Sequence, residues 1–401
     1  MVISRRGTVL DLRRGNRSAL LRALYFDSPT SRQELGAATG LSPASVSSVV
    51  NELLDAGLVI EAGAVNSDGG RPRTLIEVNP GYAKVIGIDV GETRVRVELF
   101  DLTLGKPLAT ADGPLEAGHH DVDRVVRTTV AALDRLLKEN RCKYASVLGI
   151  GVSVPGIVEQ GDVVLVHGQS FAWDAVPLAR LFADAGVAAP VFIDNGASNL
   201  GQAESWFGAG RGSRHAIVTL IGSGVGASII TDGALYRGAT SSAGEWGHTP
   251  VVVGGRQCRC GARGCLEAYI GAEAVIARYK EANPRRKVAG DSEEAELEAV
   301  VHKSRTDPAA RALLEETALY LGAGLAGLVN LFNPERIILG GWAGVLLGTE
   351  LLDEIRAAAA SHALRQPFAQ TSIELCMLGD DAVALGAATL PVERLLRGAL
   401  S

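Results

Sequence analysis

The chain has 401 residues, of which 47% are hydrophobic and 21% are charged, and its formal net charge is −6. This composition indicates a globular protein of two or three domains and excludes a disordered chain. The sequence has no run of about 18 apolar residues and no basic start followed by an apolar core. We therefore expect a cytoplasmic protein with no membrane partner. Five cysteines, three of them close together, indicate metal binding in a reducing compartment rather than a disulfide framework.

Charge is unevenly distributed along the chain. The first 33 residues carry seven arginines against two aspartates, although the chain as a whole is acidic. A basic end on an acidic body fits a small DNA-binding module joined to another domain. The alternative is a solvated charged tail with no partner.

Residues 16–80 follow the pattern of a winged helix-turn-helix. Apolar residues repeat at helical spacing over 17–26. Ser31 and Glu34 have the spacing of a capping box, which predicts the start of a second helix that ends at Gly40. A third helix after a short glycine turn completes the motif.

The third helix is predicted to begin at Ser42, with Pro43 in its first turn, and to stop at Gly57. Its valines and leucines can pack inward, which leaves a small, uncharged N-terminal face able to approach base edges in the major groove. The residues predicted to form this DNA-binding face are Ser42, Ala44, Ser45, Ser47 and Ser48.

Two β-prone runs then surround the segment NSDGGRP, as in the wing of a winged helix. Arg71 and Arg73 at this wing are predicted to contact DNA phosphates or to enter the minor groove. A small helical bundle that binds protein is the alternative to DNA binding.

One short stretch of the chain brings together a histidine and three cysteines. An imidazole and three thiolates suit one tetrahedral zinc ion. The predicted ligands are His248, Cys258, Cys260 and Cys265. By contrast, the pair His119-His120 has no possible metal ligands near it in the sequence, and we expect it in an exposed loop.

The rest of the chain contains the same strand, glycine turn and strand pattern twice, at 85–102 and at 217–233. Repetition of this unit suggests two related lobes that close on a ligand. Glycine turns can offer backbone N–H groups to phosphate, although glycine hairpins are also common without that role.

Eight segments in this order resemble the ROK family (repressors, open reading frames and kinases) of the sugar kinase, Hsp70 and actin superfamily. They are DVGET at 89–93, SVPGIV at 153–158, WDAVPL at 173–178, GSGVG at 222–226, GEWGH at 244–248, CRCGARGCLE at 258–267, ILGG at 338–341 and LGDDAVALGAA at 378–388. The resemblance extends over nearly the whole chain, including the winged helix of the repressor branch.

The resemblance implies an α/β fold in which an N-terminal winged helix-turn-helix at 1–80 precedes a two-lobed, actin-like ROK body. The smaller lobe is expected at 83–194 together with 384–401. The larger lobe, with the zinc loop and the dimer contacts, is expected at 195–383.

The resemblance also implies an effector site for a sugar. The residues expected to bind it are Gly156, Asn195, Glu245, His248 and Glu267. Carboxylates and imidazole can exchange hydrogen bonds with vicinal hydroxyls, and zinc would hold the loop that aims them. A purely structural zinc site is the alternative.

Kinases of the family carry an aspartate that deprotonates the sugar hydroxyl. Alignment on Glu204 puts Gly196 in that position, and glycine has no side chain to act as a base. Asp194 lies nearby in sequence, but its side chain is expected on the opposite face of a strand unless the loop shifts. Glu92 also places a negative charge in the first phosphate turn, so we expect no catalytic residue and no enzyme activity.

We therefore expect a DNA-binding transcriptional regulator of carbohydrate metabolism, most simply a repressor, that binds a sugar or sugar phosphate. Its expected partners are an inverted-repeat operator, the effector, and a second copy in a homodimer or a dimer of dimers. The main alternative is an ATP-dependent hexose or hexosamine kinase that retains a DNA-binding arm. A regulator whose body serves only for dimerisation is a third possibility.

Overall fold

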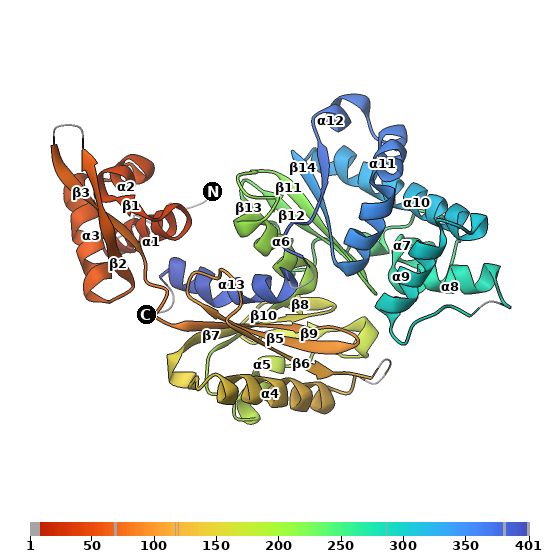
Figure 1. Ribbon diagram of the computed structural model, residues 1–401, viewed down its shortest axis with the longest axis horizontal. Helices are drawn as coiled ribbons and strands as arrows, with labels where there is room; N and C mark the ends of the chain where they lie inside the picture. Colours follow the sequence, from red (N-terminus) through yellow and green to blue (C-terminus); the bar gives the residue numbers. More distant parts are fainter. Residues whose placement is uncertain are drawn as a thin grey trace.

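The computed structural model describes residues 9–67, 70–116, 118, 120–285, 287–379 and 382–398. The histidine at 119 and the side chain of Arg71 lie outside the described residues. The chain forms a small N-terminal domain beside a body of two lobes (Figure 1). The expected fold class, a winged helix followed by an actin-like ROK body, is confirmed.

The N-terminal domain contains helices α1, α2 and α3 and a sheet in the order β1-β3-β2. Ser31 caps α2 through a complete capping box, and Gly40 ends it in a left-handed conformation, as the sequence predicts. The Ser42 side chain accepts from the Ser45 backbone N–H and caps α3, which has Pro43 in its first turn. The bounds are α1 Val9–Asp27, β1 Thr30–Ser31, α2 Arg32–Thr39, α3 Pro43–Asp55, β2 Val59–Ser67 and β3 Gly70–Val78.

The first lobe is built on a five-stranded sheet in the order β10-β7-β4-β5-β6. Strands β4, β5 and β6 are antiparallel neighbours, whereas β7 and β10 join β4 in parallel. Helices α4 and α5 cover one face of the sheet and α13 lies on the other (Figure 1). The bounds are β4 Lys84–Val90, β5 Arg94–Asp101, β6 Ala109–Pro114, α4 Val122–Glu139, β7 Val147–Val154, α5 Leu178–Asp184, β10 Val191–Asn195 and α13 Ala382–Leu396; a hairpin of β8 Ile157–Glu159 and β9 Leu165–His167 lies beside this sheet.

The second lobe repeats this strand order. Its sheet runs β13-β12-β11-β14-β15, again with an antiparallel hairpin first and two parallel strands after it. The repeated pattern in the sequence therefore corresponds to two lobes of the same topology. The bounds are β11 Ala216–Ile221, β12 Val225–Thr231, β13 Ala234–Leu235, β14 Arg336–Gly340 and β15 Ser372–Leu375; the helices are α6 Gly196–Phe207, α7 Glu267–Ile270, α8 Ala272–Ala282, α9 Glu293–Lys303, α10 Pro308–Phe332, α11 Trp342–His362 and α12 Arg365–Ala369.

Helix α10 is long and apolar enough to cross a membrane by those two criteria alone. Its side chains, however, belong to the core of the second lobe, where Leu314, Leu321 and Leu325 are buried together with residues of α11. Burial inside a folded lobe accounts for its apolar composition.

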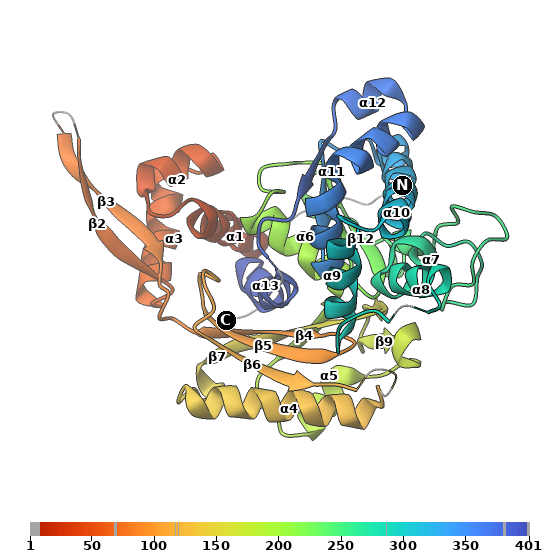
Figure 2. The same cartoon turned by 45° about the vertical axis from the view of Figure 1, so that its right-hand side comes forward.

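The winged helix shares a hydrophobic core with the body. Leu20 and Leu24 of α1 are buried in one cluster with Trp206 of α6 and Leu396 of α13. Three polar contacts add to this packing: Ser18 Oγ donates to the Leu396 carbonyl at 2.7 Å, Arg22 pairs with Glu393 at 3.2 Å, and Arg211 donates to the Phe26 carbonyl at 2.9 Å. In the turned view of Figure 2, α1 again lies beside α6 and α13. The DNA-binding module is therefore docked on the body.

Candidate effector site, metal cluster and DNA-binding face

A cavity of about 970 Å³ lies between the two lobes. The first lobe lines it with the β4–β5 turn and the segment around Gly156, and the second lobe lines it with the β11–β12 turn and the N-terminus of α6. All five residues that the sequence suggests for a sugar site line this one cavity: Gly156, Asn195, Glu245, His248 and Glu267.

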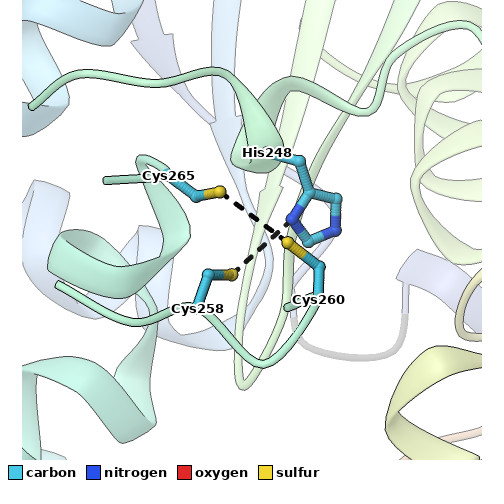
Figure 3. Close-up of side chains that lie close together, drawn as sticks. All are labelled: His248, Cys258, Cys260 and Cys265. Atoms are coloured by element: carbon cyan, nitrogen blue, oxygen red, sulfur yellow. Dashed lines mark hydrogen bonds between the residues drawn. The ribbon is translucent and has the colours of Figure 1, made fainter. Parts of the chain in front are cut away.

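The four predicted metal ligands lie together beside this cavity (Figure 3). Their ligand atoms are all within 4.8 Å of one another. Cys260 Sγ and Cys265 Sγ are 3.7 Å apart, and Cys258 Sγ lies 3.8 Å from His248 Nδ1. A tetrahedral zinc ion with Zn–S bonds of about 2.3 Å requires ligand separations of about 3.6–3.8 Å. The donor atoms and their spacing therefore fit zinc, and a separation of 3.7 Å between the two sulfurs is not a disulfide.

The imidazole of His248 links the metal cluster to the cavity. Nδ1 faces the Cys258 sulfur, while Nε2 lies 3.8 Å from a carboxylate oxygen of Glu245. Burial raises the pKa of Glu245; the neighbouring His248 opposes this shift and Glu267 adds to it. The Glu245 side chain is still 39% exposed, so its carboxylate can accept hydrogen bonds from a ligand.

The Glu267 carboxylate is bound from several sides. One oxygen accepts from the Val225 backbone N–H at 2.9 Å, and the other accepts from Arg259 Nε at 3.1 Å and lies 3.6 Å from Cys258 Sγ. Its side chain is only 8% exposed. Glu267 thus connects the metal loop to the hairpin of the second lobe.

Asn195 and Gly156 shape the opposite wall. Asn195 caps α6 by accepting from the backbone of Ala197 and Ser198, and its amide donates to the Gly156 carbonyl at 2.6 Å. Gly156 has a φ of +89°, and a Cβ there would lie 2.3 Å from the His167 carbonyl oxygen. This position therefore requires glycine.

Gly196 lines the cavity, whereas Asp194 is not among the lining residues. The Asp194 side chain is 4% exposed and its carboxylate pairs with Arg237 at 2.6 Å. A Cβ at Gly196 would meet Ser153 Oγ at 3.4 Å, which is an ordinary contact. A side chain could therefore start from this position without displacing the backbone.

Glu92 spans the cavity from the first lobe. Its carboxylate accepts from Arg259 Nη1 at 2.9 and 3.2 Å, so one arginine holds Glu92 and Glu267 together. The Glu92 carbonyl oxygen also contacts His120 Nε2 at 2.7 Å. The expectation of an exposed loop is wrong for His120, because its ring is buried and stacks on Phe171.

The DNA-binding face predicted on α3 is accessible. Ser42, Ala44 and Ser48 are exposed and Ser45 and Ser47 are half-buried, while Val46, Val49, Val50 and Leu53 point into the core. Arg73 on β3 is 40% exposed and lies 3.9 Å from Glu34. The wing strands are present, and the roles of these residues in DNA binding stay predictions.

Sequence reasoning missed four residues that shape these sites, namely Arg237, Arg259, Glu293 and Trp206. Each acts through a partner far away in the sequence, as in the 167-residue separation of Arg259 from Glu92. The one signal available in advance was the presence of an arginine between two metal-ligand cysteines.

Comparison with known proteins identifies the family. Residues 85–394 match the model described as the ROK family, and residues 13–60 match a winged helix-turn-helix DNA-binding model. The chain belongs to the ROK family. This confirms the family suggested by the sequence motifs.

Relatives include both regulators and kinases. The xylose repressor of Caldicellulosiruptor bescii is 29% identical, over 96% of this chain and 97% of that protein. The glucokinase of Thermotoga maritima is 31% identical, over 78% of this chain and 98% of that protein. A solved ROK family transcriptional regulator, described as a homologue of the Escherichia coli MLC protein, has a TM-score of 0.79 and 23% identity and covers 97% of this chain and 98% of its own; this likeness shows the fold.

Proposed function

We propose that this protein is a DNA-binding transcriptional regulator, most directly a repressor, of genes for carbohydrate metabolism. One observation carries the proposal: the sugar-site residues line a single cavity in a chain whose N-terminal domain is a docked winged helix. Relatives named as xylose repressors match over the winged helix as well as the body, which supports the regulator over the kinase. The effector is a sugar or sugar phosphate, and the DNA partner is an inverted repeat bound by a homodimer or a dimer of dimers.

Helix α6 is the proposed route from the effector to the DNA. Its first turn lines the cavity, and its last turn carries Trp206. The Trp206 ring makes edge contacts with Tyr25 and Phe26 of α1, with ring centroids 5.7 and 5.0 Å away. Over 12 residues, a rigid helix extends about 18 Å, so a shift at its cavity end would reach α1.

Helix α1 in turn contacts the predicted recognition helix. Arg13 and Arg17 of α1 pair with Glu52 of α3 at 2.8 and 3.4 Å. Closure of the lobes on a sugar would therefore move α3 through α6 and α1. Such a shift changes operator affinity only if the sugar binds the free and DNA-bound forms differently.

Zinc is the proposed cofactor. The four ligand atoms fit a tetrahedral site, and the loop that carries them also carries Glu267 and Arg259. When bound, the ion would hold this loop in place; His248 would then present Nε2 toward Glu245 and the sugar.

We further propose that the protein does not phosphorylate its sugar. Gly196 stands where a base is needed, and the nearby Asp194 is buried against Arg237. A carboxylate held in such a pair is poorly placed to take a proton from a ligand in the cavity.

The test uses a fluorescent duplex that the full chain itself selects from a random DNA pool. Operator binding is followed by anisotropy while common pentoses, hexoses, hexosamines and their phosphates are added. Release of DNA by one of these ligands, weakened in Glu245→Gln, supports the proposal. ATP-dependent phosphorylation at an ordinary kinase rate, about 1–100 per second, would favour the kinase instead.

A further inference from the structure

The lining of the effector cavity is strongly acidic. Among the described residues that form it, acidic side chains outnumber arginines by seven to three. The acidic residues are Asp89, Glu92, Glu245, Glu267, Glu294, Glu298 and Glu350, and the arginines are Arg94, Arg259 and Arg305. Two of these arginines are already paired, Arg259 with Glu92 and Glu267, and Arg305 with Glu350 at 2.7 Å. A negatively charged ligand would therefore enter a cavity of its own sign.

Both glycine turns that face the cavity hold a carboxylate. In the turn of the first lobe this is Glu92, fixed by Arg259 at 2.9 Å. In the turn of the second lobe, Ser223 Oγ donates to Glu293 at the start of α9. Burial raises the pKa of Glu293; the Ser223 hydrogen bond opposes this and the charge of Glu92 adds to it. The two carboxylates are therefore close enough to influence each other across the cavity.

The backbone groups that could hold a phosphate are also in use. Gly91 N donates to the Arg94 carbonyl at 2.9 Å, Gly222 N donates to the Gly224 carbonyl at 2.9 Å, and Val225 N donates to Glu267. The first amides of α6 are capped by Asn195. A helix N-terminus or a glycine turn binds phosphate through free N–H groups, and in these turns those hydrogen bonds are internal.

We infer that this cavity selects an uncharged sugar and excludes phosphorylated ligands, both sugar phosphates and nucleoside triphosphates. The inference rests on the proposed function, because it narrows the effector that the body is proposed to bind. Hydroxyls can still reach Glu245 and His248, whereas a phosphate would have to displace Arg259 or approach Glu92 and Glu293. Since like charges brought together in a binding site are costly, we expect a sugar phosphate to bind at least about a hundred-fold more weakly than its parent sugar.

The first experiment is titration calorimetry of the full chain with matched pairs. The probes are glucose and glucose 6-phosphate, and N-acetylglucosamine and its 6-phosphate, with xylose as an additional uncharged probe. Binding of an uncharged sugar without its phosphate supports the inference. Equal or tighter binding of a phosphate overturns it, while leaving the proposed function intact. Failure of every probe in both forms counts against the proposed function, and the nucleotide titration then decides the inference.

The second experiment uses the magnesium complex of AMPPNP, which does not depend on knowing the sugar. The wild-type chain should show no binding at millimolar nucleotide, and the double variant Glu92→Gln, Glu293→Gln should gain at least about ten-fold in affinity, since two like charges are removed. The matched control is Asp184→Asn with Asp353→Asn, which removes the same charge at side chains 66% and 95% exposed. Wild-type binding overturns the inference, and so does a double variant that stays as inert as the control.

Discussion

Replacing Trp206 by leucine should uncouple the effector from the DNA without unfolding either part. The Trp206 ring lies at the contact between α6 and α1 and is 3% exposed. The variant keeps an apolar side chain but loses the edge contacts with Tyr25 and Phe26, each worth about 0.5–1.5 kcal/mol. It also loses the Arg22 guanidinium, which lies 5.9 Å from the Trp206 ring centroid; such a contact contributes about 0.5–1 kcal/mol. The total of about 1.5–4 kcal/mol is as large as a typical coupling free energy of about 1–3 kcal/mol.

The assay is operator anisotropy with and without saturating sugar. In the wild type, sugar should weaken operator binding by about 5–150-fold, and in Trp206→Leu by no more than about three-fold. The control is Leu133→Ala on α4, a buried substitution away from the α6–α1 contact that costs about 2–5 kcal/mol of stability. A Trp206→Leu protein that responds to sugar like wild type, or a control that loses the response equally, would refute the route through α6.

Four further predictions concern single sites. Arg73→Ala, alone or with Arg71→Ala, should weaken binding to every DNA sequence and reduce the salt slope by about one unit for each lost phosphate contact; an unchanged slope would remove the wing from the interface. Cys260→Ala should lose about one zinc per chain by metal analysis and then the sugar response; retention of the response would give the ion a structural role only. Glu245→Gln should weaken sugar binding by about ten- to a hundred-fold. Because burial raises the folded-state pKa of Glu245, wild-type sugar affinity should fall as the pH is lowered through that value, while protonation favours the folded state; a variant with the same pH profile as wild type would exclude this carboxylate. Gly196→Asp should give measurable phosphorylation only if the base alone is missing, and continued inactivity in an ATP-coupled assay would implicate the phosphate turns as well.

Local signals in the sequence predict the N-terminal domain accurately. Ser31, Glu34 and Gly40 act through hydrogen bonds that span a few residues, so their spacing alone marks where α2 begins and ends. The metal cluster is predictable for a similar reason, since its cysteines lie within one short loop and its histidine is close in sequence. The strand order of the lobes is foreshadowed only by the repeated hairpins.

Contacts between distant segments could not be predicted in this way. Nothing near Asp194 in sequence indicates its partner Arg237, and nothing near Glu92 indicates Arg259. The burial of His120 likewise depends on Phe171 and on the Glu92 turn, which the fold brings together. Side chains whose roles depend on tertiary neighbours therefore required the structure, and these are the ones that set the charge of the cavity.

The central claim is that one bound sugar and one bound operator oppose each other. Calorimetry can measure the Kd of the effector sugar for the free protein and for the protein saturated with operator DNA. Linkage requires operator to weaken sugar binding by the same factor by which sugar weakens operator binding. The account predicts a larger Kd for the sugar on the DNA-bound protein, by about 5–150-fold. An identical Kd in the two forms would contradict it.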